Sequence, residues 1–591
     1  EVAVLEAMKM QHGLQSPVTG TVSAVKVALG DVVEERDLMI SVQAQEAGAE
    51  PQAGEAPKQA AQTQDAFRAD LAELEARLGR TLDANRVEKI ERRHNQGYRT
   101  ARENVDDLCD AGSFMEYGQM TIAAQRQRRE LDDLIDNTPA DGLVAGFGAI
   151  NGDHFDEDTS RAAVLAYDYT VLAGTQGLFN HKKTDRVLEI AQDWQVPMVF
   201  YTEGGGGRPG DTDASKISGG GLDVMTFATW AKASGVAPRI AVNNGYCFAG
   251  NAVLFGCADV TIATKSSYIG MGGPAMIEGG GLGQVAPKDI GPMDVQAENG
   301  VVDLLAENEI EATAMAKQFL GYFQGSLREH TCDDQRKLRT LIPEDRKRAY
   351  DMRAALELLA DTGSFLELRR AYGKGMITGF MRIEGRPFGL IANNPAHLGG
   401  AIDAEAAEKA ARFVQLCDGF DLPIVSFCDT PGFMVGPEHE KLATVRRASS
   451  LLVAGASVSV PVFLVVMRKG YGLGAQAMGM GSLHVPQMSV AWPTGEFGPM
   501  GLEGAVRLGY SKEIAAAGGE GTPDGDALFN KLLGAMIENG KALNAAMYHE
   551  IDAVIDPKDT RAYLLRALKT MPVGKKGSSH SQGKRPFIPT W

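Results

Sequence analysis

The sequence predicts an α/β protein with two copies of one strand–helix–strand unit, preceded by part of a small β-barrel. A Pro-led apolar strand that ends in an acid begins at residue 196 and recurs at residue 422, 226 positions later. A strand that runs into a glycine turn begins at residue 245 and recurs at residue 470, 225 positions later. Before residue 44, short alternating segments between Pro and Gly turns predict the strands of the barrel.

At the N-terminus, the string Glu6-Ala7-Met8-Lys9-Met10 resembles the acceptor signature of biotin carrier domains. The resemblance implies that Lys9 is the biotinylated lysine and that biotin is a covalent cofactor. The alternative interpretation is a solvated lysine on an amphipathic segment. It is disfavoured because strand patterns follow at residues 16–22, 25–27 and 30–33.

Residues 1–43 resemble the C-terminal half of a biotinyl domain, because such domains carry their lysine near the middle. We therefore expect this chain to be the C-terminal part of a longer polypeptide. Residues 44–64 are rich in Ala, Pro, Glu and Gln and contain no aromatic residue, which is typical of a linker. Such a segment spans about 25 Å as a coil and about 70 Å when fully extended.

Two similar domains are predicted after the linker, over residues 65–330 and 331–591. Each contains a helical segment before its Pro-led strand, at residues 184–194 and 404–420. Strand, helix and strand at this spacing indicate βαβ units, and hence mostly parallel sheets covered by helices.

The composition excludes several classes of function. The 591 residues carry a formal net charge of −17, which argues against nucleic acid as a partner because phosphate binding needs a basic field. No run approaches 18 apolar residues, so neither a transmembrane helix nor a membrane partner is predicted. The six cysteines form no C-x-x-C pair, so we expect buried thiols in a reducing cytoplasm rather than disulfides or zinc.

In each copy, a strand enters a glycine-containing turn that a helix follows, at residues 247–250 and 472–475. Unpaired N–H groups at the start of such a helix stabilise an enolate or another oxyanion when two of them point at one oxygen. For a single turn, tight packing of helix on sheet is the alternative. Two equivalent turns in a chain that also carries the acceptor string favour the oxyanion role.

A second glycine-rich loop covers residues 203–210 and has its counterpart at residues 429–433. It matches neither G-x-x-x-x-G-K-[ST] nor G-x-G-x-x-G with a ribose-binding acid downstream, so a phosphate cradle is not predicted. We expect this loop to line a cleft for an acyl or pantetheine group.

Other catalytic chemistries find no support in the sequence. It has no G-x-S-x-G elbow, and its ten histidines show no metal-ligand spacing, so neither a serine hydrolase nor a metal site is predicted. His181 and His397 are interpreted as polar-turn or core histidines rather than bases. For Lys182 and Lys183, which precede a predicted helix, two interpretations stay open: a solvated basic corner or contact with a CoA phosphate.

Four further segments resemble the carboxyltransferase of biotin-dependent acyl-CoA carboxylases. Residues 168–174 are similar to the family's D-x-T-V-x-G-G motif, and residues 385–395 to the entry of its second domain. The segments at residues 429–433 and 468–472 match strongly. Together with the biotinyl half-domain and the linker, the resemblance covers nearly the whole chain.

The resemblance implies two crotonase-like domains, which are duplicated βαβ superhelix units, assembled as a homohexamer. The active site then lies between the first domain of one subunit and the second domain of another. The order of biotinyl half-domain, linker and carboxyltransferase is similar to single-chain carboxylases, especially the bacterial long-chain acyl-CoA type. It implies acyl-CoA as substrate, ATP-dependent biotin carboxylase upstream in the same polypeptide, and a biotin protein ligase as partner.

The family's functional residues carry over to the two turns and their neighbours. In the first domain the oxyanion amides would be those of Ala249 and Gly250. In the second domain they would be those of Leu473 and Gly474. Gln476 stands where propionyl-type enzymes carry an acid, so it would bias the choice of acyl chain. The other predicted substrate-binding residues are Lys183, Gly205, Gly206, Pro431, Gly432 and Phe433.

The resemblance also implies a reaction mechanism, and it leaves three alternative functions to consider. CO₂ passes from carboxybiotin to the α-carbon of the acyl-CoA, and the ureido nitrogen takes the α-proton, so no protein base is required. A propionyl- or methylcrotonyl-CoA carboxylase would differ only in the acyl group. A biotin-dependent decarboxylase usually carries biotin on a separate chain, and a scaffold without activity would not need intact glycine turns in both copies.

Deleting residues 44–64 is expected to slow overall carboxylation far more than carboxyl transfer involving free biotin. The linker lets the carrier visit two distant sites, whereas free biotin needs no carrier. Steady-state rates in the two assays check this expectation. Equal losses in both would show that the segment is structural.

Overall fold

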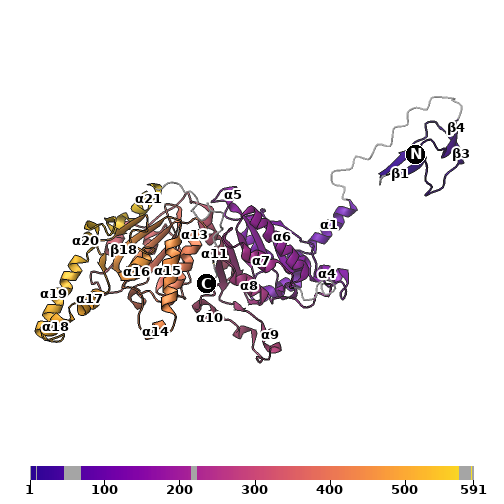
Figure 1. Ribbon diagram of the computed structural model, residues 1–591. Helices are drawn as coiled ribbons and strands as arrows, with labels where there is room; N and C mark the ends of the chain where they lie inside the picture. Colours follow the sequence, from indigo (N-terminus) through magenta and orange to yellow (C-terminus); the bar gives the residue numbers. More distant parts are fainter. Residues whose placement is uncertain (1, 8–9, 45–67, 214–221, 571–587, 589–591) are drawn as a thin grey trace. The chain divides into compact units, whose positions relative to one another are not determined.

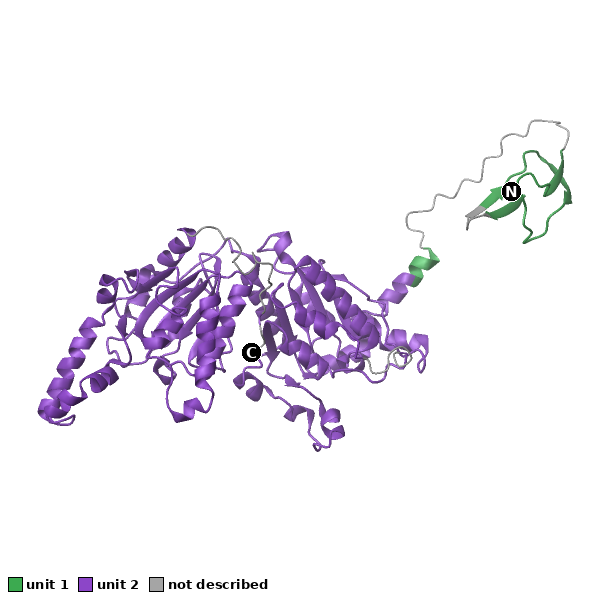
Figure 2. Cartoon of the chain, viewed as in Figure 1, with its two compact units in different colours: residues 1–73 green, residues 74–591 purple. Residues whose placement is uncertain are grey.

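The structure is a computed structural model that describes residues 2–7, 10–44, 68–213, 222–570 and 588. The chain divides into two compact units, residues 1–73 and residues 74–591 (Figure 1, Figure 2). Most of the predicted linker, residues 45–64, lies outside the described residues.

The first unit contains two antiparallel strand pairs. Strand β1 (Ala3–Ala7) pairs with β2 (Met10–Leu14), with Ala7 opposite Met10, and β3 (Gly20–Val25) pairs with β4 (Ile40–Ala44). The strand predicted at residues 30–33 is wrong, because the carboxylate of Asp31 accepts the N–H of Ala28 in a turn there. Between residues 2 and 44 no described residue is classed as buried, which is expected because isolated strand pairs do not enclose a core.

The first sheet of the second unit has seven strands in the order β13-β11-β9-β8-β7-β6-β5. Strands β7, β8, β9, β11 and β13 run parallel, and β5 and β6 add antiparallel pairs at one edge. The strands are β5 (Met115–Glu116), β6 (Leu143–Ala149), β7 (Arg161–Tyr167), β8 (Met198–Tyr201), β9 (Arg239–Asn243), β11 (Val260–Thr264) and β13 (Leu304–Ala306).

The second sheet repeats this order as β14-β15-β16-β17-β18-β19-β21, with β20 attached to β18. Its central register repeats as well: Ala163 lies opposite Met198 in the first sheet, and Gly389 lies opposite Ile424 in the second. Each residue of the second pair lies 226 positions after its counterpart in the first pair, which confirms the predicted duplication. The strands are β14 (Leu366–Leu368), β15 (Met376–Ile383), β16 (Arg386–Asn393), β17 (Ile424–Thr430), β18 (Val462–Tyr471), β19 (Met488–Ala491), β20 (Glu496–Gly498) and β21 (Ala553–Val554).

A short parallel strand pair carries the glycine turn in each half. Strand β10 (Tyr246–Phe248) pairs with β12 (Tyr268–Gly270), while the end of β18 pairs with β20. Helix α8 (Gly250–Gly256) follows β10, and α16 (Gly472–Met478) follows β18. The strand–turn–helix order predicted in both copies is therefore confirmed.

Helices α6 (Leu178–Trp194) and α13 (Ala404–Gly419) connect equivalent strands in the two halves. The predicted helix at residues 404–420 is confirmed, whereas the one predicted at residues 184–194 begins earlier, at Leu178. Helix α11 (Glu309–Gln324) packs against strands of both sheets, and Figure 1 shows it between the halves. The two sheets therefore share one hydrophobic core.

The remaining helices cover the sheets or extend from their ends. In the described part of the chain, none has the length and apolar character needed to cross a membrane. They are α1 (Ala69–Gly79), α2 (Val87–Asn95), α3 (Ala101–Leu108), α4 (Leu131–Asn137), α5 (Glu157–Ser160), α7 (Thr226–Lys232), α9 (Pro274–Gly279), α10 (Met293–Glu298), α12 (Met352–Leu359), α14 (Pro437–Glu440), α15 (Thr444–Ser457), α17 (Leu502–Gly509), α18 (Ser511–Ala516), α19 (Pro523–Asn539), α20 (Ala542–Met547) and α21 (Thr560–Thr570).

Candidate active site

The first corner, residues 246–250, turns the chain from β10 into α8. Ala249 has φ 52° and ψ −122°, a conformation that L residues rarely adopt. Such strain costs about 1–3 kcal/mol and is concentrated at functional sites. The N–H of Ala249 donates to the carbonyl of Gly270 (3.2 Å), so it is not free for an oxyanion. Of the predicted pair, this leaves the N–H of Gly250, which lies in the first turn of α8, where N–H groups lack intrahelical acceptors.

Asn251 ties the first corner to the segments beside it. Its buried side chain accepts the N–H of Gly206 (2.9 Å) and donates to the carbonyls of Gly174 (3.3 Å) and Thr202 (3.2 Å). An asparagine supplies an acceptor and two donors in one short side chain. Asn251 thus fixes three neighbouring main-chain groups.

The glycine loop packs directly against the first corner. A Cβ at Gly204 would lie 2.1 Å from the carbonyl oxygen of Gly174, and one at Gly206 would lie 2.6 Å from the Cβ of Ala249. The N–H of Gly205 donates to the carbonyl of Ala173 (3.1 Å). The structure therefore brings two predicted substrate-binding residues, Gly205 and Gly206, to the corner and to the motif at residues 168–174.

The second corner, residues 470–475, turns β18 into α16. Leu473 and Gly474 lie in the first turn of α16, so their N–H groups have no intrahelical acceptor. The side chain of Leu473 is exposed, but a Cβ at Gly474 would lie only 2.6 Å from the Cα of Gly432. Both residues of the second predicted pair therefore lie at the start of α16, and Gly474 packs against the loop at residues 429–433.

That loop is held by its own side chains and by a buried ion pair. The hydroxyl of Thr430 accepts the N–H of Gly432 (3.1 Å), and Phe433 packs against the main core. The buried carboxylate of Asp429 accepts a hydrogen bond from Nε of Arg468 (3.0 Å), on the adjacent strand. The loop therefore presents Pro431 and Gly432 beside the second corner on a rigid base.

A pocket of about 610 Å³ opens beside the second corner. Gln476 of α16 lines it, and its volume is in the range of ordinary ligand sites. Its wall combines apolar side chains with a few polar groups. The apolar members are Ala475, Leu483, Phe497, Pro499, Leu502, Met536 and Ala545.

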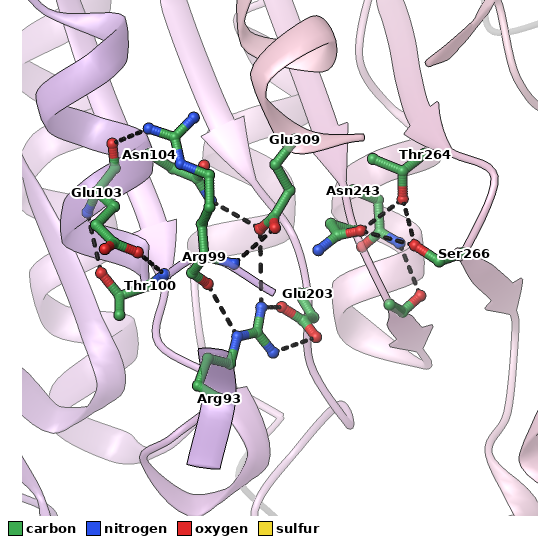
Figure 3. A network of polar contacts seen from close by, with 12 residues as sticks. Arg93, Arg99, Thr100, Glu103, Asn104, Glu203, Asn243, Thr264, Ser266 and Glu309 are labelled. Atoms are coloured by element: carbon green, nitrogen blue, oxygen red, sulfur yellow. Dashed lines mark hydrogen bonds and ion pairs between the residues drawn. The ribbon is translucent and has the colours of Figure 1, made fainter. Parts of the chain in front are cut away.

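The sequence did not reveal a buried ion pair behind the first corner (Figure 3). Arg93 of α2 donates to both carboxylate oxygens of Glu203 (2.9 and 2.5 Å), and its guanidinium lies 3.9 Å from Glu309. Burial raises the pKa of Glu203 to about 7, although Arg93 acts in the opposite direction. A Cβ at Gly245 would lie 2.4 Å from Oε1 of Glu203, so this pair supports the chain that enters the corner. The sequence pattern predicts that Glu203 follows a strand, but it does not indicate that Arg93 is the partner of this acid.

Lys183 does not reach the surface. It is 7% exposed, and its ammonium donates to the main-chain carbonyls of Gly118 (3.1 Å), Ala140 (3.4 Å) and Leu143. Burial lowers its pKa to about 8. The contact with a CoA phosphate proposed for Lys183 is therefore wrong, because main-chain carbonyls occupy its ammonium. Lys182 is exposed, with its ammonium 5.6 Å from the ring centre of Phe179.

His181 and His397 each lie beside a polar side chain, and four of the cysteines are buried. Nδ1 of His181 lies 2.8 Å from Oγ1 of Thr226, and burial lowers the pKa of this histidine. His397 lies in a turn, 3.7 Å from Asp403. No three His, Cys, Asp or Glu side chains within the described ranges gather as a metal site would require. Four cysteines are buried free thiols: Cys109, Cys247, Cys417 and Cys428.

The β1–β2 pair fits an acceptor lysine. The strands that flank the acceptor string pair with each other, with Ala7 opposite Met10. Met8 and Lys9 are the residues between them in the sequence, and both lie outside the described residues. The predicted attachment of biotin at Lys9 therefore stays a prediction, and the register on either side of it agrees with a hairpin.

In a comparison with known proteins, two parts of the chain match two different family models. The family model of the carboxyl transferase domain matches residues 92–581, and that of biotin-requiring enzymes matches residues 1–42. The propionyl-CoA carboxylase beta chain of Saccharopolyspora erythraea is 32% identical over 522 residues, which cover 85% of this chain and 92% of that protein.

Two solved structures are similar over most of this chain. A single-chain, multi-domain long-chain acyl-CoA carboxylase matches with a TM-score of 0.81 and 51% identity over 95% of this chain. The match covers 53% of that enzyme, so this chain spans about half its length. The transcarboxylase 12S hexamer, solved with methylmalonyl-CoA bound, matches with a TM-score of 0.72 and 29% identity over 87% of this chain and 98% of its own.

Proposed function

The chain belongs to the carboxyl transferase domain family, and from this premise we propose that it moves a carboxyl group from biotin to the α-carbon of a long-chain acyl-CoA. The family comprises the carboxyltransferases of biotin-dependent acyl-CoA carboxylases, and covalently attached biotin is the cofactor. The observation that carries the proposal is the pair of equivalent corners, each with first-turn amides beside a glycine-containing loop.

The corners supply the electrostatic part of the reaction. When bound, carboxylated biotin provides the carboxyl group, and its ureido nitrogen provides an acceptor for the α-proton. The N–H groups of one corner would hold the enolate oxygen of the thioester, and those of the other would hold the ureido oxygen. In this proposal Gly250 contributes the N–H group of the first corner and Leu473 and Gly474 contribute those of the second, and the ureido nitrogen takes the place of a protein base.

Sequence identity and the character of the pocket both support a preference for long acyl chains. The chain is 51% identical to the single-chain long-chain enzyme, against 32% to the propionyl-CoA carboxylase beta chain. The pocket beside Gln476 is walled largely by apolar side chains, which suits a hydrocarbon chain. A propionyl-type enzyme is the second candidate, because relatives of that type cover most of this chain.

The organisation of the whole enzyme is part of the proposal. We assign residues 1–43 to a biotinyl half-domain, 44–64 to a linker, and 65–330 and 331–591 to the two carboxyltransferase domains. The proposal includes an upstream biotin carboxylase and a homohexamer, which the similarity to the single-chain enzyme and to the 12S hexamer supports. It also includes a biotin protein ligase as partner and a cytoplasmic location.

The transferase half-reaction tests this function. With free biotin, the purified chain should convert a carboxylated long-chain acyl-CoA to the parent acyl-CoA, at a rate that depends on the biotin concentration. A folded chain without biotin-dependent turnover would contradict the proposal. ATP-dependent fixation of bicarbonate by the full-length polypeptide separates a carboxylase from a decarboxylase.

Gln476→Asp is expected to shift preference towards short acyl-CoA. A carboxylate beside an apolar chain costs more than a neutral amide, because burying a charge is expensive. The measurement is the ratio of kcat/KM for a long acyl-CoA to that for propionyl-CoA. Since one methylene is worth only about 1–3 kcal/mol in an apolar pocket, a shift below about tenfold carries no weight.

Gln476→Asn is the matched control, because it has the length of Asp without the charge. It should keep the parent ratio. An unchanged ratio in a folded Gln476→Asp protein would place the selectivity elsewhere. The next candidate is the loop at residues 271–284, in which Met271, Met276 and Leu282 are exposed.

A further inference from the structure

We propose that one buried water molecule binds in a polar cavity behind the first corner and fixes the strand end from which that corner departs. The cavity is lined by residues of α2 and α3 and by residues at the carboxyl ends of β7, β8 and β9. Its volume is about 20 Å³, and about 10–15 Å³ is the least that holds a water. The cavity therefore has room for one water and little else.

Two asparagines line this cavity, Asn104 and Asn244, and each has one unpaired side-chain atom in the described part of the chain. Asn104 is 6% exposed and donates through Nδ2 to Glu309 (3.1 Å), while its Oδ1 finds no partner in the described part of the chain. Asn244 is 7% exposed, and its Oδ1 accepts from the hydroxyls of Thr264 (2.6 Å) and Ser266 (3.0 Å). Its Nδ2 has no partner among the described residues either.

The chemistry of these atoms selects water. Oδ1 of Asn104 needs a donor and Nδ2 of Asn244 needs an acceptor, and the bonds on the other side of each amide fix which atom faces the cavity. A cation would leave the donor unpaired. An anion would leave the acceptor unpaired and would face the carboxylates of Glu203 and Glu309. Water donates and accepts at once, and buried polar groups are seldom left unpaired.

The position of the cavity connects this water to the first corner. Asn244 directly precedes Gly245, which packs against the carboxylate of Glu203 and leads into β10. Asn104 belongs to α3, which lies outside the duplicated strands. A water between the two asparagines would tie that helix to the strand end, and so hold the start of the corner in place.

A pair of isosteric variants at Ala101 tests the inference. Ala101 lines the cavity and is the first residue of α3, so replacing it removes no side-chain hydrogen bond. Ala101→Val fills the space with methyl groups and leaves both amide atoms unpaired. Ala101→Thr has the same shape and similar helix propensity, but its hydroxyl donates and accepts as the water does. The Val variant should melt at least about 2 °C below the Thr variant.

A crystal structure of the unaltered chain provides the direct observation. It should show one water about 2.7–3.2 Å from both Oδ1 of Asn104 and Nδ2 of Asn244. An empty cavity, or amides turned to pair with protein groups, would overturn the inference, and so would equal melting temperatures of the two variants. These readouts do not depend on catalytic activity. In the half-reaction, the Val variant should lose kcat relative to the Thr variant at similar KM, and equal kcat values would refute the positioning role.

Discussion

A Lys9→Arg variant is expected to carry no biotin and, in the full-length polypeptide, to lose overall carboxylation completely. Arginine keeps the positive charge, but its guanidinium stays protonated and is not a nucleophilic amine. The paired strands on either side of residue 9 do not depend on this side chain, so the fold should persist. Streptavidin blotting measures the biotin, and incorporation of labelled bicarbonate into acyl-CoA measures the activity.

Two controls make the loss specific. Lys26→Arg changes an exposed lysine of the same unit and should leave biotinylation intact. The Lys9→Arg chain should retain the half-reaction with free biotin, because both corners are unchanged. Biotin found on the Lys9→Arg protein, or carboxylation at the parent rate, would show that the acceptor is another residue.

The duplication could be predicted because buried parallel strands are nearly continuous apolar runs that leave a clear pattern in the sequence. The displacement of 226 positions between the Pro-led strands is the same displacement that relates Met198 to Ile424 in the two sheets. Glycines before a helix likewise mark where each corner turns. Fold class and the location of both corners therefore follow from local sequence patterns.

The details that the sequence did not predict depend on distant contacts. The N–H of Ala249 donates to the carbonyl of Gly270 on a neighbouring strand, and a pattern of glycines in a turn does not predict that partner. Lys183 was expected near a helix start, but α6 begins at Leu178, and Lys183 lies within it with its ammonium against main-chain carbonyls. Arg93 reaches Glu203 from a helix 110 positions earlier. In each case tertiary packing decides what the side chain or amide can do.

Gly474→Val is expected to lower kcat for carboxyl transfer about 100- to 1000-fold. That is the usual cost of one lost oxyanion donor, about 2.7–4 kcal/mol. The physical reason is a collision: any Cβ at this position would lie 2.6 Å from the Cα of Gly432, so either the first turn of α16 or the loop at residues 429–433 must move. Steady-state kinetics of the half-reaction measure the loss, and size-exclusion chromatography shows whether assembly is retained.

Two companion variants decide whether the amide or merely the packing matters. Gly256→Val adds the same side chain at the end of the equivalent helix α8, where a Cβ meets no atom within 4 Å, and should leave turnover near the parent value. Leu473→Ala removes an exposed side chain but keeps the backbone N–H. It too should retain kcat if the backbone N–H stabilises the oxyanion. A Gly474→Val protein with normal assembly and near-normal turnover would remove the second corner from the active site. A large loss in Leu473→Ala would instead assign the effect to side-chain contacts with substrate, because only the side chain has changed.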